Sequence, residues 1–213
     1  MSLSIEELTK GINYWHTTKS QGNSQSPADF HNGYYQKALA GIRINAAFDL
    51  EWWNRFYPIL HSWKATRPAS RLLLTTRAQQ RFEQLGRAWS NAIAPRLQDD
   101  LETVEWGHVS AFASLVTEIK PLKNPSPVFT SKFCHLLAPH IFPIVDRDAV
   151  GDPSPWYETY FTKVREEWLS TDALTQAELT KALTDAIGAP VFAGFPMKCK
   201  VIEVCLIDRR QAN

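Results

Sequence analysis

The residues of this chain best suited to chemistry are a lysine and an aspartate that flank an apolar segment. Lys132 lies in a mainly apolar stretch, and Phe142-Pro143-Ile144 then leads to Asp146. This order predicts a helix that opens near Lys132, a short apolar crossing, and Asp146 at the start of the next helix. Brought together in a dry place, the amine and the carboxylate would serve either as a nucleophile with its acid/base partner or as a buried structural ion pair.

Other groups in this stretch offer weaker chemistry. His135 and His140 could join Asp146 and Asp148 around a metal ion, but the spacing alone is weak evidence. A histidine satisfied within a helical core is the commoner case. Cys134 is poorly placed to pair with His135, because adjacent residues on a helix point in different directions. We therefore expect neither a metal nor a cofactor.

Positive charge is concentrated in one part of the chain. Between Arg55 and Arg87 there are seven arginines and lysines and one acid, Glu83, although the formal net charge of the whole chain is only +1. Local positive charge can build an anion-binding face on a near-neutral protein. Because the chain as a whole is nearly neutral, tight nonspecific binding of nucleic acid is not expected. If the arginines bind no anion, they form a solvated helical face. The candidates for contacts with nucleic-acid phosphates are Arg67, Arg71, Arg77 and Arg81.

Tryptophan is frequent, with eight copies, and most of these rings are expected to fill the core. The adjacent pair Trp52-Trp53 is a special case. Neighbouring residues on a helix point about 100° apart. One of the two rings is therefore expected at a rim or groove.

Length and composition fit an ordinary globular protein. The 213 residues suit a single helical domain over 1–213, with two lobes over about 1–100 and 101–213 as one arrangement. No apolar stretch approaches the roughly 20 residues that a membrane-spanning helix needs, and no secretory signal is visible. The three cysteines lack metal-ligand spacing. A reduced, cytoplasmic protein without membrane contact is the expectation.

Helical periodicity dominates and predicts an all-α, multi-helix globular domain with about 8–10 helices. Ser4 or Ser2 is expected to cap the first helix and Asp49 the third, and Gly188 is expected to stop the helix over 175–187. A last helix is expected over about 197–208. Leu72-Leu73-Leu74 is expected to be extended or a buried connection, with Thr75 or Thr76 capping the helix that follows.

The order of a lysine helix, an apolar segment, a hydrophobic-Pro-hydrophobic-x-Asp motif and a further helix resembles a known family. In this sequence the motif is Phe142-Pro143-Ile144-Val145-Asp146. The resemblance is to the helix-hairpin-helix DNA glycosylase superfamily, in particular the 8-oxoguanine DNA glycosylase-like fold. The stretches 49–53 and 63–68 also resemble a divergent, uncharacterised bacterial group related to that fold. The likeness covers about residues 103–170 in helix order.

The resemblance implies a DNA N-glycosylase/lyase of DNA repair. Lys132 would be the nucleophile and Asp146 its assistant, acting on a base flipped out of DNA or on a nucleotide. The residues 125–130 contain no glycine, unlike the phosphate-binding hairpin of the family, and the interval from Lys132 to Asp146 is shorter. The implied walls of the substrate pocket are Trp52, Trp53, Phe133, His135 and Trp156.

Two other interpretations remain open at the level of sequence. The first is a noncatalytic helical module that binds nucleic acid or a protein through the Arg-rich face over 55–87. The second is a helical protein of unrelated fold in which Lys132 and Asp146 only stabilise the core.

Overall fold

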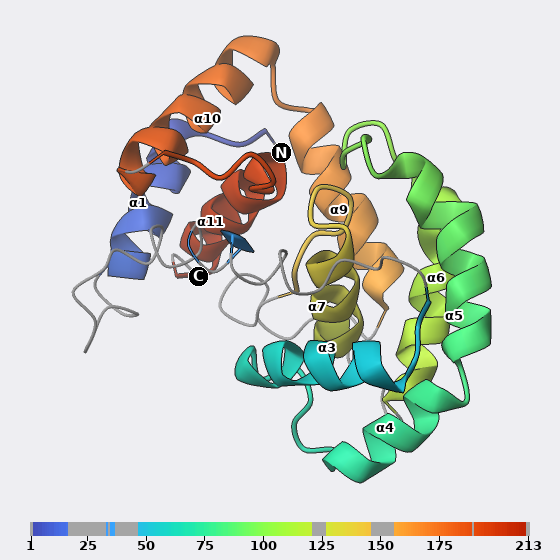
Figure 1. The fold of residues 1–213 in the computed structure, drawn as a ribbon. Helices are drawn as coiled ribbons and strands as arrows, with labels where there is room; N and C mark the ends of the chain where they lie inside the picture. The colour runs from blue at the N-terminus through green and yellow to red at the C-terminus, as the bar shows by residue number, and fades with distance from the viewer. Residues whose placement is uncertain are drawn as a thin grey trace.

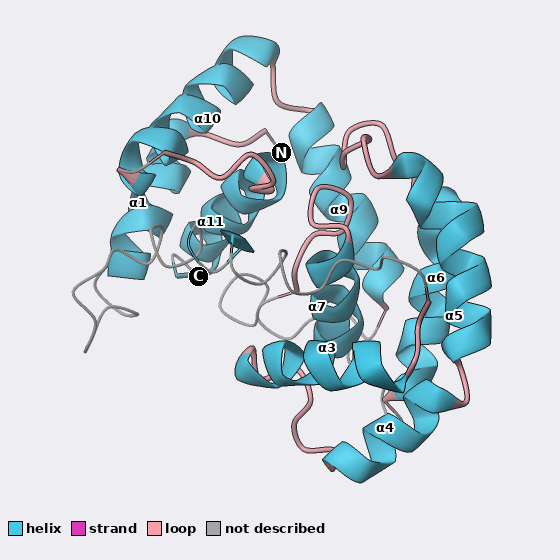
Figure 2. Ribbon diagram, in the orientation of Figure 1, coloured by secondary structure: helices cyan, strands magenta, loops and turns pink. Residues whose placement is uncertain are grey.

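A computed structural model of the chain describes residues 2–16, 33, 35–36, 47–120, 127–145, 156–188 and 190–211. These residues form nine α-helices and no strand (Figure 2). The predicted all-α class and the predicted number of helices are both confirmed. Asp146, together with most of the stretch between residues 17 and 46, lies outside the described residues.

A π-helical turn, Trp89–Ile93, and a 3-10 turn, Ala94–Arg96, continue α5. The nine helices are α1 (Ile5–Tyr14), α3 (Leu50–Ser62), α4 (Arg71–Gln79), α5 (Phe82–Ala88), α6 (Trp106–Ile119), α7 (Pro127–Leu137), α9 (Tyr157–Leu169), α10 (Ala173–Ile187) and α11 (Met197–Gln211).

Three of the helix ends expected from the sequence are confirmed. The Ser4 side chain accepts from the Glu7 amide while the Glu7 carboxylate accepts from the Ser4 amide, which is a capping box at the start of α1. Asp49 Oδ1 accepts the Trp52 amide at 2.7 Å at the start of α3. Gly188 ends α10 with a φ of 70°, a left-handed conformation that glycine adopts without strain.

The helices fall into two groups with α7 and α9 between them (Figure 1). The first helix of the chain, α1, packs against the last two, α10 and α11, while α3, α4, α5 and α6 lie together on the other side. Helix α9 contacts α6, α7 and α11 and so joins the groups. This grouping brings the two ends of the chain together.

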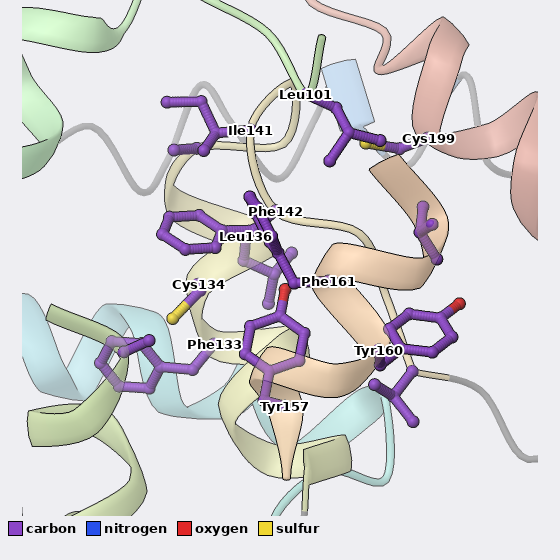
Figure 3. Close-up of a cluster of buried hydrophobic side chains, with 14 of the residues drawn as sticks. Leu101, Phe133, Cys134, Leu136, Ile141, Phe142, Tyr157, Tyr160, Phe161 and Cys199 are labelled. Atoms are coloured by element: carbon purple, nitrogen blue, oxygen red, sulfur yellow. The ribbon is translucent and has the colours of Figure 1, made fainter. Parts of the chain in front are cut away.

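Helix α7 lies in the interior and organises the core. Its side chains are buried on nearly every face, as expected for a helix that other elements surround. Figure 3 shows Phe142 beside Tyr157 and Phe161 of α9, with Cys134 and Leu136 of α7 close by. The ring centroids of Phe142 and Phe161 are 6.3 Å apart. The apolar crossing that follows α7 is therefore part of the core.

The prediction for Leu72-Leu73-Leu74 is wrong, because these residues form the first turn of α4. Ser70, and not Thr75 or Thr76, is the cap, and its Oγ accepts the Leu73 amide at 3.3 Å. Only Leu74 is buried, and it packs inward with Ala78 one helical turn later. The run of three leucines resembled a buried strand because sequence alone did not show that two of them are exposed.

The expectation for the tryptophan pair is also wrong. Trp52 and Trp53 are 2% and 0% exposed. Trp52 stacks on Phe56 with centroids 4.8 Å apart, and Phe133 of α7 covers the other side of the cluster. A helix enclosed on two faces can bury neighbouring rings that point 100° apart.

Candidate functional site

The amine of Lys132 reaches the end of α3. Lys132 lies in the middle of α7, which begins at Pro127, so the expectation that the helix opens near Lys132 is wrong. Its Nζ donates a hydrogen bond of 2.9 Å to the backbone carbonyl of Trp63. The residue is half-buried, in contrast to the adjacent Ser131 and Phe133, which are fully buried. Lys132 is thus the charged, half-buried residue of a mainly buried helix.

A second lysine, for which the sequence held no signal, binds the loop that follows α3. Lys120 directly follows α6, is 5% exposed, and its Nζ donates to the carbonyls of Ala65 at 2.8 Å and Arg67 at 2.7 Å. Burial lowers the pKa of Lys120 to about 8, and the nearby charge of Lys132 adds to this effect. No local sequence spacing marks Lys120, because both of its carbonyl partners lie more than fifty positions earlier in the chain.

The two ammonium groups bind the C-cap of α3 and the turn that follows it. Trp63 is the C-cap of α3, and Lys64 follows with a φ of 57°. The last carbonyls of a helix have no intrahelical donor, and the negative end of the helix dipole lies there. Cationic donors from α6 and α7 therefore suit this turn electrostatically as well as through hydrogen bonds.

The crossing that leads to Asp146 is fixed along α7 by buried hydrogen bonds. The Val145 amide donates to Ser131 Oγ at 3.0 Å, which places this residue beside the neighbour of Lys132. The Tyr157 hydroxyl donates to the Pro143 carbonyl at 2.7 Å. Asp146 itself lies outside the described residues. The chain is nonetheless anchored at the residue directly before it.

His135 also fixes the crossing, and both of its ring nitrogens are engaged. Nδ1 lies 2.5 Å from the Phe142 carbonyl, and Nε2 faces the hydroxyl of Tyr35. A carbonyl can only accept, so Nδ1 carries the proton and Nε2 accepts from Tyr35. This arrangement gives His135 a positioning role. Within the described residues, no group of three or more metal-ligating side chains comes together.

The predicted phosphate-binding arginines have different surroundings. Arg67 and Arg71 are exposed, and Arg67 belongs to the turn that Lys120 binds. The Arg71 guanidinium lies 5.1 Å from the centre of the Tyr57 ring. Arg81 forms an ion pair of 2.7 Å with Glu118, and Arg77 is half-buried. Arg67 and Arg71 are therefore the two that share a surface with the turn.

The predicted pocket residues occupy two kinds of environment. Trp52, Trp53 and Phe133 contact one another within the core. His135 is buried and lies against Trp63, with ring centroids 6.1 Å apart. Trp156 is 63% exposed directly before α9. The structure thus packs Trp52 and Trp53 against α7, the helix that carries Lys132, Phe133 and His135, and leaves Trp156 on the surface.

Comparison of the chain with family models, with curated proteins and with solved structures finds no match. The resemblance to DNA glycosylases remains a prediction that depends on the residues quoted for it. Among the described residues, no helix is both long enough and apolar enough to cross a membrane.

Proposed function

We propose that the protein acts on DNA and excises a base through the amine of Lys132, with assistance from Asp146. The observation that carries the proposal is the hydrogen bond from Lys132 Nζ to the Trp63 carbonyl. It places the candidate nucleophile directly against the turn that bears Arg67, so two features that the sequence left separate become neighbours. An amine beside phosphate-binding cations is the combination that attack on a DNA sugar requires.

A second cation lies at the turn that Lys132 binds. A lysine is nucleophilic only without its proton, and a neighbouring cation makes loss of that proton easier. Lys120 supplies such a neighbour, since its ammonium group binds the same turn. Lys120 itself is nearly inaccessible and donates to two carbonyls, whereas Lys132 is half-buried and is the more accessible amine.

In the proposed reaction the Lys132 nitrogen forms a bond to C1′ of the sugar, and the bond from C1′ to the base breaks. Asp146 accepts the proton that the amine nitrogen loses and passes it to the departing base. Opening of the sugar ring then gives an imine between Lys132 and C1′. Burial of the crossing and the hydrogen bond of Val145 hold the chain at the residue directly before Asp146.

Borohydride trapping tests this proposal, because the reagent reduces the imine to a stable covalent link. Duplexes containing an abasic site or one of a panel of damaged bases are incubated with the protein and borohydride. We expect a cross-link that Lys132→Ala abolishes. Lys163→Ala is the matched control, since Lys163 is an exposed lysine on α9 and its loss should leave the cross-link unchanged.

A noncatalytic binding module is the second candidate, and one observation favours it. From Ser62 to Gln80 the chain carries Lys64, Arg67, Arg71 and Arg77 and no acidic residue. Such a surface can bind phosphates without any chemistry. Failure to trap any substrate of the panel, with salt-sensitive DNA binding intact in Lys132→Ala, would reject base excision and leave this module.

A further inference from the structure

The connection between α3 and α4 combines positive charge with exposed leucines. We define the basic corner as residues 63–73, which include the first turn of α4. Leu72 is 77% exposed and Leu73 is 41% exposed. An apolar patch flanked by cations indicates a contact surface for a partner that is both apolar and anionic. The charged residues of the basic corner are all exposed cations: Lys64, Arg67 and Arg71.

The connection between α9 and α10 has the opposite charge and the same apolar character. We define the acidic corner as residues 166–178, which run from the last turn of α9 into the second turn of α10. It contains no lysine or arginine. Leu174 is 71% exposed and Leu169 is 46% exposed. The exposed acids of the acidic corner are Glu166, Asp172 and Glu178.

The two corners present their most exposed leucine in the same way. Leu72 is the second residue of α4, whose N-cap is Ser70. Leu174 is the second residue of α10, whose N-cap is Asp172. Each leucine thus lies in the first turn of a helix with charges of one sign around it. Contact between a basic and an acidic corner would bury both leucines and bring opposite charges together at the rim.

Both corners are ordered before any contact forms. Three carbonyls of the basic corner accept from buried or half-buried lysine amines, as described above. In the acidic corner Thr171 is 3% exposed, its Oγ1 accepts from the Leu3 amide at 3.0 Å, and its carbonyl accepts from Gln176 Nε2 at 3.0 Å. Contact between preordered surfaces loses little conformational entropy, which favours association.

The two corners lie at opposite ends of the molecule. Figure 1 shows α4 at the bottom and the connection between α9 and α10 at the top. One copy therefore cannot pair its own corners, and the complementary surface must come from a second copy. A contact that uses a different surface on each partner leaves one corner free at each end. Further copies can then add in the same orientation.

We infer that copies of this chain associate head to tail, with the basic corner of one copy on the acidic corner of the next. Charge complementarity selects this arrangement, because two basic or two acidic corners would bring like charges together. The apolar part of the contact is only two leucines from each corner. Such a contact is smaller than a standard interface, so the association should be weaker than about 1 µM.

Sedimentation velocity of the full chain tests the inference. The weight-average sedimentation coefficient should rise as the protein concentration increases from about 1 µM to about 1 mM. Leu72→Asp places an acid in the basic corner, and Leu174→Lys places a cation in the acidic corner. Each variant alone should associate about tenfold more weakly or less, because like charges then face each other.

A mixture of these two variants separates head-to-tail contact from other modes of association. The Leu72→Asp protein keeps an intact acidic corner, and the Leu174→Lys protein keeps an intact basic corner. Their mixture should therefore form a dimer and nothing larger, and this dimer would also show that both variants are folded. Gln84→Asp and Gln84→Lys are the matched controls, since Gln84 is exposed on α5. Neither control should change the association.

Salt tests the contribution of charge. Raising the salt from about 0.1 M to about 1 M shortens the Debye length from about 10 Å to about 3 Å and should weaken the association. A chain that stays monomeric over the whole concentration range would overturn the inference. Association that either leucine variant leaves intact, or a mixture of the two that stays monomeric, would overturn it as well. None of these measurements involves DNA, so failure of base excision leaves the inference standing.

Discussion

The amine of Lys120 lies 2.7 Å from the carbonyl oxygen of Arg67, across fifty-three positions of the chain. The same amine binds the carbonyl of Ala65, and Lys132 binds that of Trp63. Lys120 directly follows α6, and Lys132 lies on α7. These two mainly apolar helices thus each supply one cation to the end of α3 and the turn after it. These contacts hold the turn that leads into α4, and so they help to position the arginines of α4.

Replacing either lysine with methionine should destabilise the protein, and Lys120→Met should have the larger effect. The Ala65 carbonyl is buried and would lose its donor, at a cost of about 2 kcal/mol. Lys132→Met should cost about 1 kcal/mol, because the half-buried Trp63 turn is closer to water. Urea unfolding at constant pH measures both values.

Lys163→Met is the control for loss of a lysine, and it should change the free energy of unfolding by less than about 0.5 kcal/mol. Equal effects of Lys120→Met and Lys132→Met would contradict the view that burial of the carbonyl sets the cost. A shift in the slope of the denaturation curve would indicate a change in the compactness of one state.

Gly11→Ala should destabilise the packing of α1 against α11. A Cβ at this position would lie 2.1 Å from the Val204 carbonyl oxygen and 2.7 Å from Val204 Cγ1. The nearest obstacle is backbone, so the two helices must move apart, at a cost of about 2–3 kcal/mol. Thermal or urea unfolding of the purified variant measures the loss.

Gly86→Ala is the matched control, because Gly86 lies within α5 and an added Cβ would meet nothing within 4 Å. Alanine is the better helix former, so this variant should be stabilised by about 0.5–1 kcal/mol. If both variants lost stability equally, the close approach of α1 and α11 would not be the cause.

Local signals made much of the fold predictable from the sequence. Ser4, Asp49 and Gly188 mark helix ends through side-chain and backbone chemistry that depends only on near neighbours. The first turn of α4 was misassigned because a strand and a helix can both bury one leucine of three. Burial of the Trp52-Trp53 pair depends on α7, which lies far away in the sequence.

The candidate site was predictable only in part for the same reason. Lys132 was recognised through the motif that follows it, and its contact with Trp63 spans sixty-nine positions. Lys120 has no motif, and only tertiary structure places it under the same turn. Its depressed pKa is likewise a consequence of burial in the folded protein.

Stability should fall steeply above about pH 9, because three buried thiols keep their protons in the folded state. Burial raises the pKa of Cys199 and Cys205 to about 12, and it raises that of Cys134 well above its usual range. The unfolded chain loses these protons near pH 8.5, so above that value it binds fewer protons than the folded chain. Each thiol then removes about 1.4 kcal/mol of stability per pH unit.

Lys120 acts in the opposite direction between about pH 8 and 10.5, since its folded pKa lies below the unfolded value. In that window Lys120 adds about 1.4 kcal/mol to the free energy of unfolding per pH unit. Its neutral amine still has two N–H groups to donate to its two carbonyls. Urea unfolding with a reductant at pH 8, 9 and 10 should therefore show a steeper decline for Lys120→Met than for the unmodified chain. The double variant Cys199→Ala, Cys205→Ala should start lower and decline less. A decline with equal slope in all three proteins would mean that other groups govern the alkaline limit.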